Sequence, residues 1–151
     1  MPNKEKTTKR KEKTSKIEPQ TKDKFFNAIK NNDIERIKNI VESEVPIVDI
    51  QCINEALIIA LERYNWEIVK YLIESGADVN TKVKDGYDNK TVLIIASEKE
   101  NWEMVKYLIE RGADVNTKVD GYNKSKTALI IAAEKKNWEM VKYLIEKGAN
   151  I

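Results

Sequence analysis

Apolar residues recur at three- and four-residue spacing along most of this chain, which is the spacing of helices with a buried face. One stretch, Asn-Trp-Glu-(Ile/Met)-Val-Lys-Tyr-Leu-Ile-Glu, occurs three times with a step of 36 residues, beginning at Asn65, Asn101 and Asn137. Each copy is apolar around much of its helical circumference, which indicates a helix that packs against neighbours on more than one side. A fixed period of this length predicts a stacked-repeat architecture.

Each of these helices is preceded by a shorter predicted helix, which begins at Glu55, Thr91 or Thr127. Threonine can cap a helix with its hydroxyl group, and the asparagine that opens each longer helix is also a good N-cap. Each longer helix is expected to end at a glycine, because glycine adopts the left-handed conformation at low cost. These glycines are Gly76, Gly112 and Gly148.

Two polar segments, 78–90 and 114–126, separate the repeats, and each contains an Asp-Gly pair. Asp-Gly favours tight turns, so both segments are expected to form extended, hairpin-like loops. The region from Asp23 to residue 53 carries apolar residues at helical spacing, interrupted at Asn31–Asp33. It is interpreted as a degenerate first repeat.

These motifs resemble those of the ankyrin-repeat family. The segments Thr91–Ala96 and Thr127–Ala132 stand where the family has Thr-Pro-Leu-His-x-Ala, and the family's Gly-Ala-Asp-Val-Asn stands at Gly76–Asn80 and Gly112–Asn116. The resemblance implies an all-α ankyrin-repeat solenoid of stacked helix-turn-helix repeats joined by hairpin-like loops. The expected repeats span about 23–53, 54–89, 90–125 and 126–151.

The chain departs from the family pattern at several positions. The proline of the motif is replaced by Ala56, Val92 and Ala128, and its histidine by Ile58, Ile94 and Ile130. Apolar packing is expected to replace the polar contact of that histidine. The glycine that often ends the first helix is replaced by Tyr64, Glu100 and Lys136, and Glu44 replaces the repeat glycine in the first repeat.

Three tryptophans, Trp66, Trp102 and Trp138, begin the longer helices. They are expected to pack in the core rather than to stack on a ligand. The second helix of the last repeat is as apolar as the internal ones, whereas solenoid ends normally carry a polar outer face. Three interpretations stay open: a partly exposed end, self-association, or a chain cut from something longer.

The resemblance implies non-catalytic binding of a partner protein through concave helix ends and loop tips. The helix ends vary between repeats while the scaffold does not, and tyrosine recurs in both loops; tyrosine is enriched in binding hot spots. Ordinary turn chemistry and solvated charge are the alternative interpretation of these positions. The candidate partner-binding residues are Arg63, Tyr64, Tyr87, Asp88, Asn89, Lys99, Glu100, Tyr122, Asn123, Lys135 and Lys136.

Charge is distributed unevenly along the chain. Residues 1–24 carry nine Lys or Arg against four Asp or Glu, whereas the remainder carries eighteen against twenty-one. Residues 1–22 are expected to be a disordered basic tail, because they hold too few apolar residues to offset the ordering entropy. An alternative function is therefore that this tail, with Lys9–Lys13 at its centre, binds nucleic acid or an anionic surface while the repeats act as scaffold.

Catalysis, metals and membranes are disfavoured by composition. The chain has no histidine and one cysteine, Cys52, so the commonest general base and metal ligand are missing. No enzyme activity, cofactor, metal or small-molecule substrate is expected. The longest apolar runs are six residues, far below the roughly 20 that span a bilayer. Without a signal peptide or membrane span, the expected location is cytoplasmic, with delivery into a host cell left open.

Overall fold

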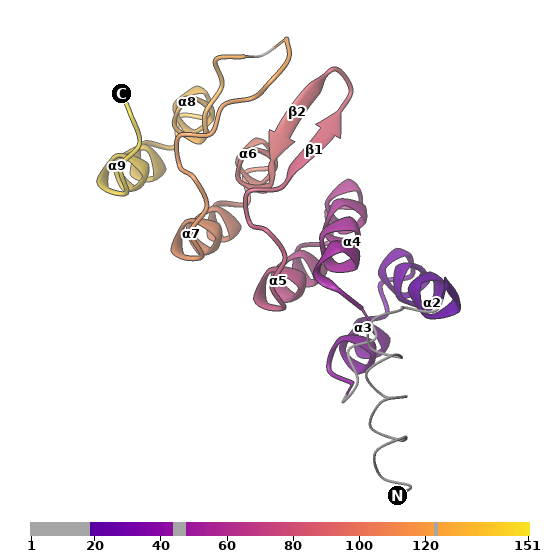
Figure 1. Ribbon diagram of the computed structural model, residues 1–151. Helices are drawn as coiled ribbons and strands as arrows, with labels where there is room; N and C mark the ends of the chain where they lie inside the picture. Colours follow the sequence, from indigo (N-terminus) through magenta and orange to yellow (C-terminus); the bar gives the residue numbers. More distant parts are fainter. Residues whose placement is uncertain (1–18, 44–47, 123) are drawn as a thin grey trace, which may run out of the picture. The chain divides into compact units, whose positions relative to one another are not determined.

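The computed structural model describes residues 19–43, 48–122 and 124–151 and divides after Ala77 into two compact units (Figure 1). The first unit holds two helix pairs. Helix α2 packs against α3 and α4, and α4 packs against α5. Aliphatic and aromatic side chains such as Phe25, Ile37 and Leu72 fill its core at essentially zero exposure. The helices are α2 (Pro19–Lys30), α3 (Ile34–Val41), α4 (Ile50–Glu62) and α5 (Trp66–Glu74).

Two boundaries in this unit differ from the sequence-based expectation. Helix α2 begins at Pro19, so the last residues of the expected tail are helical. Helix α4 begins at Ile50 rather than near Glu55, because Asp49 caps it: the backbone N–H of Cys52 donates to the Asp49 carboxylate at 2.9 Å. That hydrogen bond, together with the nearby Lys22 charge, lowers the pKa of Asp49. The rest of the tail and Glu44 lie outside the described residues.

The second unit begins with a hairpin and continues with two helix pairs (Figure 1). The first pair, α6 and α7, forms the third repeat, and the second pair, α8 and α9, forms the fourth. Helix α6 packs on both α7 and α8. The elements are β1 (Lys82–Asp85), β2 (Asp88–Thr91), α6 (Val92–Glu98), α7 (Trp102–Glu110), α8 (Ala128–Glu134) and α9 (Trp138–Glu146).

The predicted helix caps are confirmed in these repeats. The Asn101 side chain accepts a hydrogen bond from the N–H of Met104 at 3.2 Å, and the Thr91 hydroxyl accepts one from Ile94 at 3.4 Å. Helix α7 ends at Gly112, whose φ of +93° lies in the left-handed region. The N–H of Ala113 then bonds back to the carbonyl of Leu108 at 2.9 Å, which closes the helix end.

The expectation that all three tryptophans lie in the core is wrong. Trp66 and Trp102 are only half-buried, and the Trp138 side chain is 65% exposed. Trp102 packs against the edge of a buried cluster formed by Ile94, by Val119 from the loop that follows this repeat and by Ile131 from the fourth repeat. A tryptophan at this helix start is therefore covered by the next repeat, whereas the interior is filled by aliphatic side chains.

Candidate functional site

The most exposed aromatic residues of the second unit lie on two neighbouring loops. The first loop is the β1–β2 hairpin, in which Lys84 pairs with Asn89 and Asp85 with Asp88 across the strands. Gly86 and Tyr87 form its two-residue turn, and Gly86 has a φ of +64° at the first turn position, where glycine is favoured. The hairpin predicted for this segment is confirmed.

The second loop, residues 114–126, contains no assigned strand in its described residues and attaches to the first loop. The N–H of Val119 donates to the carbonyl of Lys126 at 3.0 Å across the second loop. Asn89 and Asp120 exchange two backbone hydrogen bonds, at 2.6 and 3.0 Å, as an isolated antiparallel bridge. The ammonium group of Lys82 forms an ion pair with the Asp120 carboxylate beside this bridge. The N–H of Tyr122 donates to the Asp88 carboxylate at 2.7 Å. The loop after the third repeat is thus held by the hairpin before it.

Gly121 makes this close approach between the loops possible. Its φ is +137°, and a β-carbon placed there would lie 2.3 Å from Asp88 Oδ1 and 2.6 Å from the carbonyl oxygen of Tyr87. Both distances are far below van der Waals contact, so any other residue at this position would push the loops apart. The glycine therefore fixes where the side chain of the next residue, Tyr122, emerges.

The result is an aromatic pair at the loop tips, Tyr87 and Tyr122, called here the tyrosine pair. The ring centroids lie 5.8 Å apart with an interplanar angle of 76°, an edge-to-face arrangement that aromatic rings favour. Both side chains point into solvent, with 85% and 86% of their surface exposed. Two large side chains are thus held against each other by the backbone beneath them and remain open to a ligand.

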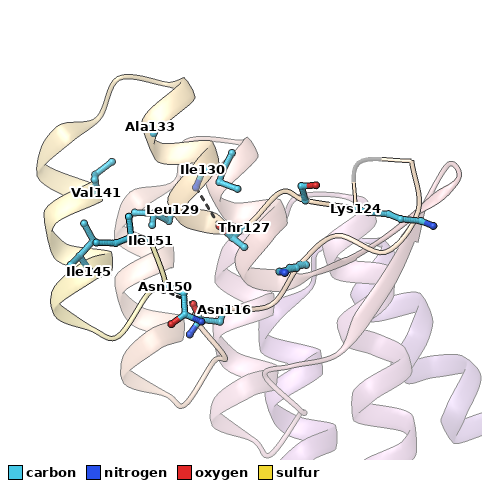
Figure 2. Close-up of a pocket in the computed structure, with 12 residues that line it drawn as sticks. Asn116, Lys124, Thr127, Leu129, Ile130, Ala133, Val141, Ile145, Asn150 and Ile151 are labelled. Atoms are coloured by element: carbon cyan, nitrogen blue, oxygen red, sulfur yellow. Dashed lines mark hydrogen bonds between the residues drawn. The ribbon is translucent and has the colours of Figure 1, made fainter.

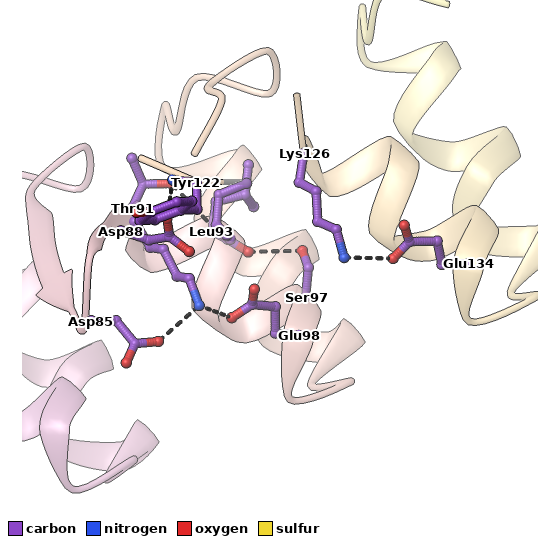
Figure 3. A network of polar contacts seen from close by, with 11 residues as sticks. Asp85, Asp88, Thr91, Leu93, Ser97, Glu98, Tyr122, Lys126 and Glu134 are labelled. Carbon is purple, nitrogen blue, oxygen red and sulfur yellow. Dashed lines mark hydrogen bonds and ion pairs between the residues drawn. The ribbon is translucent and has the colours of Figure 1, made fainter. Parts of the chain in front are cut away.

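Ion pairs at the base of each loop fix it to the helix that follows (Figure 3). The ammonium group of Lys90 lies 2.8 Å from Asp85 and 2.9 Å from Glu98. Burial lowers the pKa of Lys90, but the hydrogen bonds and charges of the two carboxylates outweigh it, and the pKa lies above its ordinary value. Lys126 and Glu134 form the equivalent pair in the fourth repeat, at 3.1 Å.

The other candidate residues lie at the ends of the first helices. Lys99, Glu100, Lys135 and Lys136 are all exposed, and the carboxylate of Glu100 lies 3.8 Å from the Lys135 ammonium group. Glu100 and Lys136 adopt φ angles of +58° and +60°, which cost a non-glycine residue roughly 1–2 kcal/mol. The family glycine that these residues replace would adopt the same conformation without that cost.

The first unit carries the matching helix end. Arg63 is exposed, and Tyr64 is 46% exposed with a φ of +52°, so the same strained conformation recurs there. The Tyr64 and Trp66 rings lie 6.5 Å apart between centroids, tilted by 36°. The position at which the sequence departs from the family therefore has one backbone conformation in three repeats and a different side chain in each.

The other candidate loop residues differ in their exposure. Asp88 is buried, with 8% of its surface exposed, and its carboxylate is used to hold Tyr122. Its role is structural, because the hairpin turns this side chain inward, towards the second loop. Asn89 is exposed, but its backbone is occupied by the bridge to Asp120. Asn123 lies outside the described residues.

Sequence reasoning missed that the two loops join. The signal was present, because the tripeptide Asp-Gly-Tyr occurs in both, at Asp85–Tyr87 and Asp120–Tyr122. Its first copy forms the turn of a hairpin, whereas its second copy lies against that hairpin. The shared tripeptide alone did not indicate that the second copy would lie against the first.

The described residues meet the requirements of neither a metal site nor a membrane span. In the described part of the chain, no group of three or more His, Cys, Asp or Glu side chains is placed to hold a metal ion. No helix within those same residues is both long and apolar enough to cross a bilayer.

Comparison with known proteins identifies the repeats. A family model described as ankyrin repeats (3 copies) matches residues 25–119 and 89–151. No curated protein matches the chain significantly. The match covers nearly all of the described region, and together with the helix pairs it confirms the all-α ankyrin-repeat fold expected from the sequence.

Proposed function

The chain belongs to the ankyrin-repeat family, and from that premise we propose that it binds a partner protein through the tyrosine pair and the first-helix ends. Ankyrin repeats generally serve as protein–protein interaction modules and are typically non-catalytic. The tyrosine pair is the observation that supports this particular binding surface. Its rings contact each other and are exposed to solvent, and hydrogen bonds hold the two loops beneath them together.

The tyrosine pair has the properties of a binding hot spot. Tyrosine supplies a large contact area with few rotatable bonds, so its immobilisation on binding costs little entropy. The base is already ordered by the Asn89–Asp120 bridge and by the bond from Tyr122 to Asp88. A partner that covers both rings would therefore gain their apolar area with little additional ordering of the loops.

The strained helix ends support the second set of proposed contacts. Left-handed non-glycine residues cost stability, and such conformations tend to be retained at functional positions. At Tyr64, Glu100 and Lys136 the side chains that accompany the strain are aromatic, acidic and basic. This variation on a constant backbone is what selective recognition by a common scaffold would require.

A capture experiment tests the proposal. The wild-type chain and the Tyr87→Ser/Tyr122→Ser variant are immobilised in parallel, and proteins retained from a lysate of the source organism are quantified by mass spectrometry. The matched control is Ile50→Ser, which removes an exposed apolar residue of the first unit. We expect one or more proteins retained by the wild type and the control to be lost with the tyrosine variant. Equal retention by all three would contradict the proposal.

A backbone variant separates the geometry of the pair from its chemistry. Gly121→Ala keeps both tyrosines but forces the loops apart, because the new β-carbon would clash with Asp88. Gly86→Ala is the matched control, since it also has a positive φ but meets nothing within 4 Å. Retention should fall with Gly121→Ala more than with Gly86→Ala. If Gly86→Ala is the more damaging, the pairing of the rings is irrelevant to binding.

Tail-driven binding remains a hypothesis from the sequence alone, because Lys9–Lys13 lie outside the described residues. Deletion of residues 1–18, which leaves helix α2 intact, distinguishes the two functions. Capture that survives the deletion supports the repeats. Loss of capture, with a steep dependence on salt in the full chain, supports the tail.

A further inference from the structure

The fourth repeat exposes apolar residues whose counterparts in the third repeat are buried. Ile94 is 0% exposed, whereas Ile130, its counterpart, is 39% exposed. Val105 is fully buried, but Val141 is only half-buried. The side chains are the same, so the difference lies in the neighbours. Helix α6 packs against both α7 and α8, whereas α8 packs against α9 and, on the side of the preceding repeat, against α6, and no further described helix covers its other side.

This end face contains a groove of about 560 Å³ (Figure 2). Its apolar floor comes from both helices of the fourth repeat, and Ile151 adds a side chain from beyond α9. Lys118 and Lys124 line its other side, from the second loop. The apolar lining residues are Leu129, Ile130, Ala133, Val141, Ile145 and Ile151.

A projecting side chain stands on the same face. Trp138 is 65% exposed and is not among the residues that line the groove. Its counterpart Trp102 packs on the cluster that contains Ile94, the counterpart of Ile130, so Trp138 and Ile130 belong to one face. The face therefore presents both a hole and a knob, which is the condition for a surface to be complementary to itself.

The third repeat indicates which kind of side chain can occupy this groove. Ile94 is covered by Val119 of the second loop and by Ile131 of the fourth repeat. Head-to-tail stacking of a second copy would not reproduce this, because the first repeat carries the exposed polar residue Asn27 at the position of Ile131. An indole is a better match to this groove, since it supplies apolar area and its face attracts the ammonium groups of Lys118 and Lys124.

We propose that two copies of this chain associate through the α8–α9 end face with two-fold symmetry, each inserting Trp138 into the groove of the other. The surface is distinct from the tyrosine pair, so binding of a partner there and self-association are separate properties. Because the proposed contact is confined to one end face of the repeats, we expect a reversible dimer that forms at high protein concentration.

Sedimentation equilibrium across a concentration series tests this proposal. We expect the wild type to pass from monomer to dimer and to stop at dimer. Trp138→Lys should weaken dimerisation about 30-fold or more, as loss of a central aromatic anchor does. Ile130→Lys, which alters the groove rather than the knob, should weaken it as well. The matched control is Ile50→Lys, an exposed apolar residue of the first unit, which should leave the dimer unchanged.

Other outcomes would overturn the proposal. A chain that remains monomeric throughout the series has no second copy on this face. Growth beyond the dimer indicates head-to-tail stacking, and a dimer that survives Trp138→Lys uses another surface. Thermal unfolding of each variant, followed by circular dichroism, shows that the variants are folded at the temperature of sedimentation.

Discussion

Helices α7 and α9 have the same nine-residue sequence, Trp-Glu-Met-Val-Lys-Tyr-Leu-Ile-Glu, yet they occupy different environments. In α7 the helix is covered by neighbours, and Val105 is fully buried. In α9 the equivalent Val141 is half-buried, and Ile145 is 39% exposed. The two helices begin with the same asparagine cap and end at the same kind of glycine. Local sequence therefore sets the helix, while burial depends on whether another repeat lies against it.

The comparison also separates two kinds of stabilisation. Caps and turns act within one repeat and are repeated in both, so their contributions should be alike in the third and fourth repeats. Side chains on the face between repeats contribute only where the next repeat covers them. Variants at equivalent positions in the two repeats measure the two kinds separately.

The largest difference is expected between Ile94→Ala and Ile130→Ala. Truncation of the fully buried Ile94 should lower the free energy of unfolding by about 3 kcal/mol, because it leaves a cavity. Ile130 is 39% exposed, so its truncation should cost about 1 kcal/mol or less. Urea unfolding at low protein concentration measures both. Equal costs would mean that the end face is covered even in the monomer.

A smaller difference is expected between the tryptophans. Trp102→Ala should cost about 2 kcal/mol, because the half-buried ring covers the Ile94 cluster. Trp138→Ala should cost less than about 0.5 kcal/mol in the monomer, as for most exposed positions. Thermal unfolding provides the measurement, with Tyr87→Ala as an exposed aromatic control. A Trp138 cost as large as that of Trp102 would show that the indole packs inside the monomer.

The strained helix ends should respond alike in both repeats. Glu100→Gly and Lys136→Gly should each raise the free energy of unfolding by about 0.5–1 kcal/mol, because glycine adopts their positive φ without steric cost. Part of the gain is offset by the greater freedom of glycine in the unfolded chain. The check is the urea midpoint of each variant. Destabilisation at either position would show that its side chain makes contacts worth more than the strain.

The smallest effect concerns one tyrosine hydroxyl in two repeats. The Tyr71 hydroxyl donates to the Glu42 carboxylate at 2.9 Å, whereas the buried Tyr143 hydroxyl has no hydrogen-bond partner within the described ranges. Tyr71→Phe should therefore cost about 0.5 kcal/mol, while Tyr143→Phe should be neutral or slightly stabilising. Paired urea unfolding curves at neutral pH give both values, and a larger loss at Tyr143 would contradict the assignment.

The environment of Tyr71 also predicts how the free energy of unfolding depends on pH. Burial, followed by the hydrogen bond to Glu42, raises the pKa of Tyr71 from 10.0 to about 12. The neutral hydroxyl is thus favoured in the folded state, and this contribution is complete below pH 10 and lost as the pH rises towards 12. Tyr71→Phe should reduce the fall in unfolding free energy over that window. An unchanged alkaline fall would mean that another group causes it.

Much of the fold could be predicted because its signals are local. The step of 36 residues, the asparagine cap at Asn101 and the left-handed glycine at Gly112 each follow from a few neighbouring residues, and the structure contains all of them. The start of α4 was missed, because the capping signal at Asp49 lies outside the repeated motif.

The candidate site could be predicted only in part. The exposure of the tyrosine pair follows from its place in polar loops, but its edge-to-face contact depends on Gly121 lying against Asp88. That contact joins residues about one repeat apart, and no local rule fixes it. The burial of Asp88 and the exposure of Trp138 could not be predicted for the same reason, since each depends on packing between residues that are distant in sequence.

The sequence by itself determined the period, the caps, the helix pairs and the apolar positions, because these depend on hydrogen bonds and side-chain spacing within one repeat. Only the tertiary structure decided which copies of an identical helix are buried, how the two loops join and where the tryptophans lie. The physical reason is that burial depends on contacts between repeats, and a motif repeated without change does not specify which residues will pack against each copy.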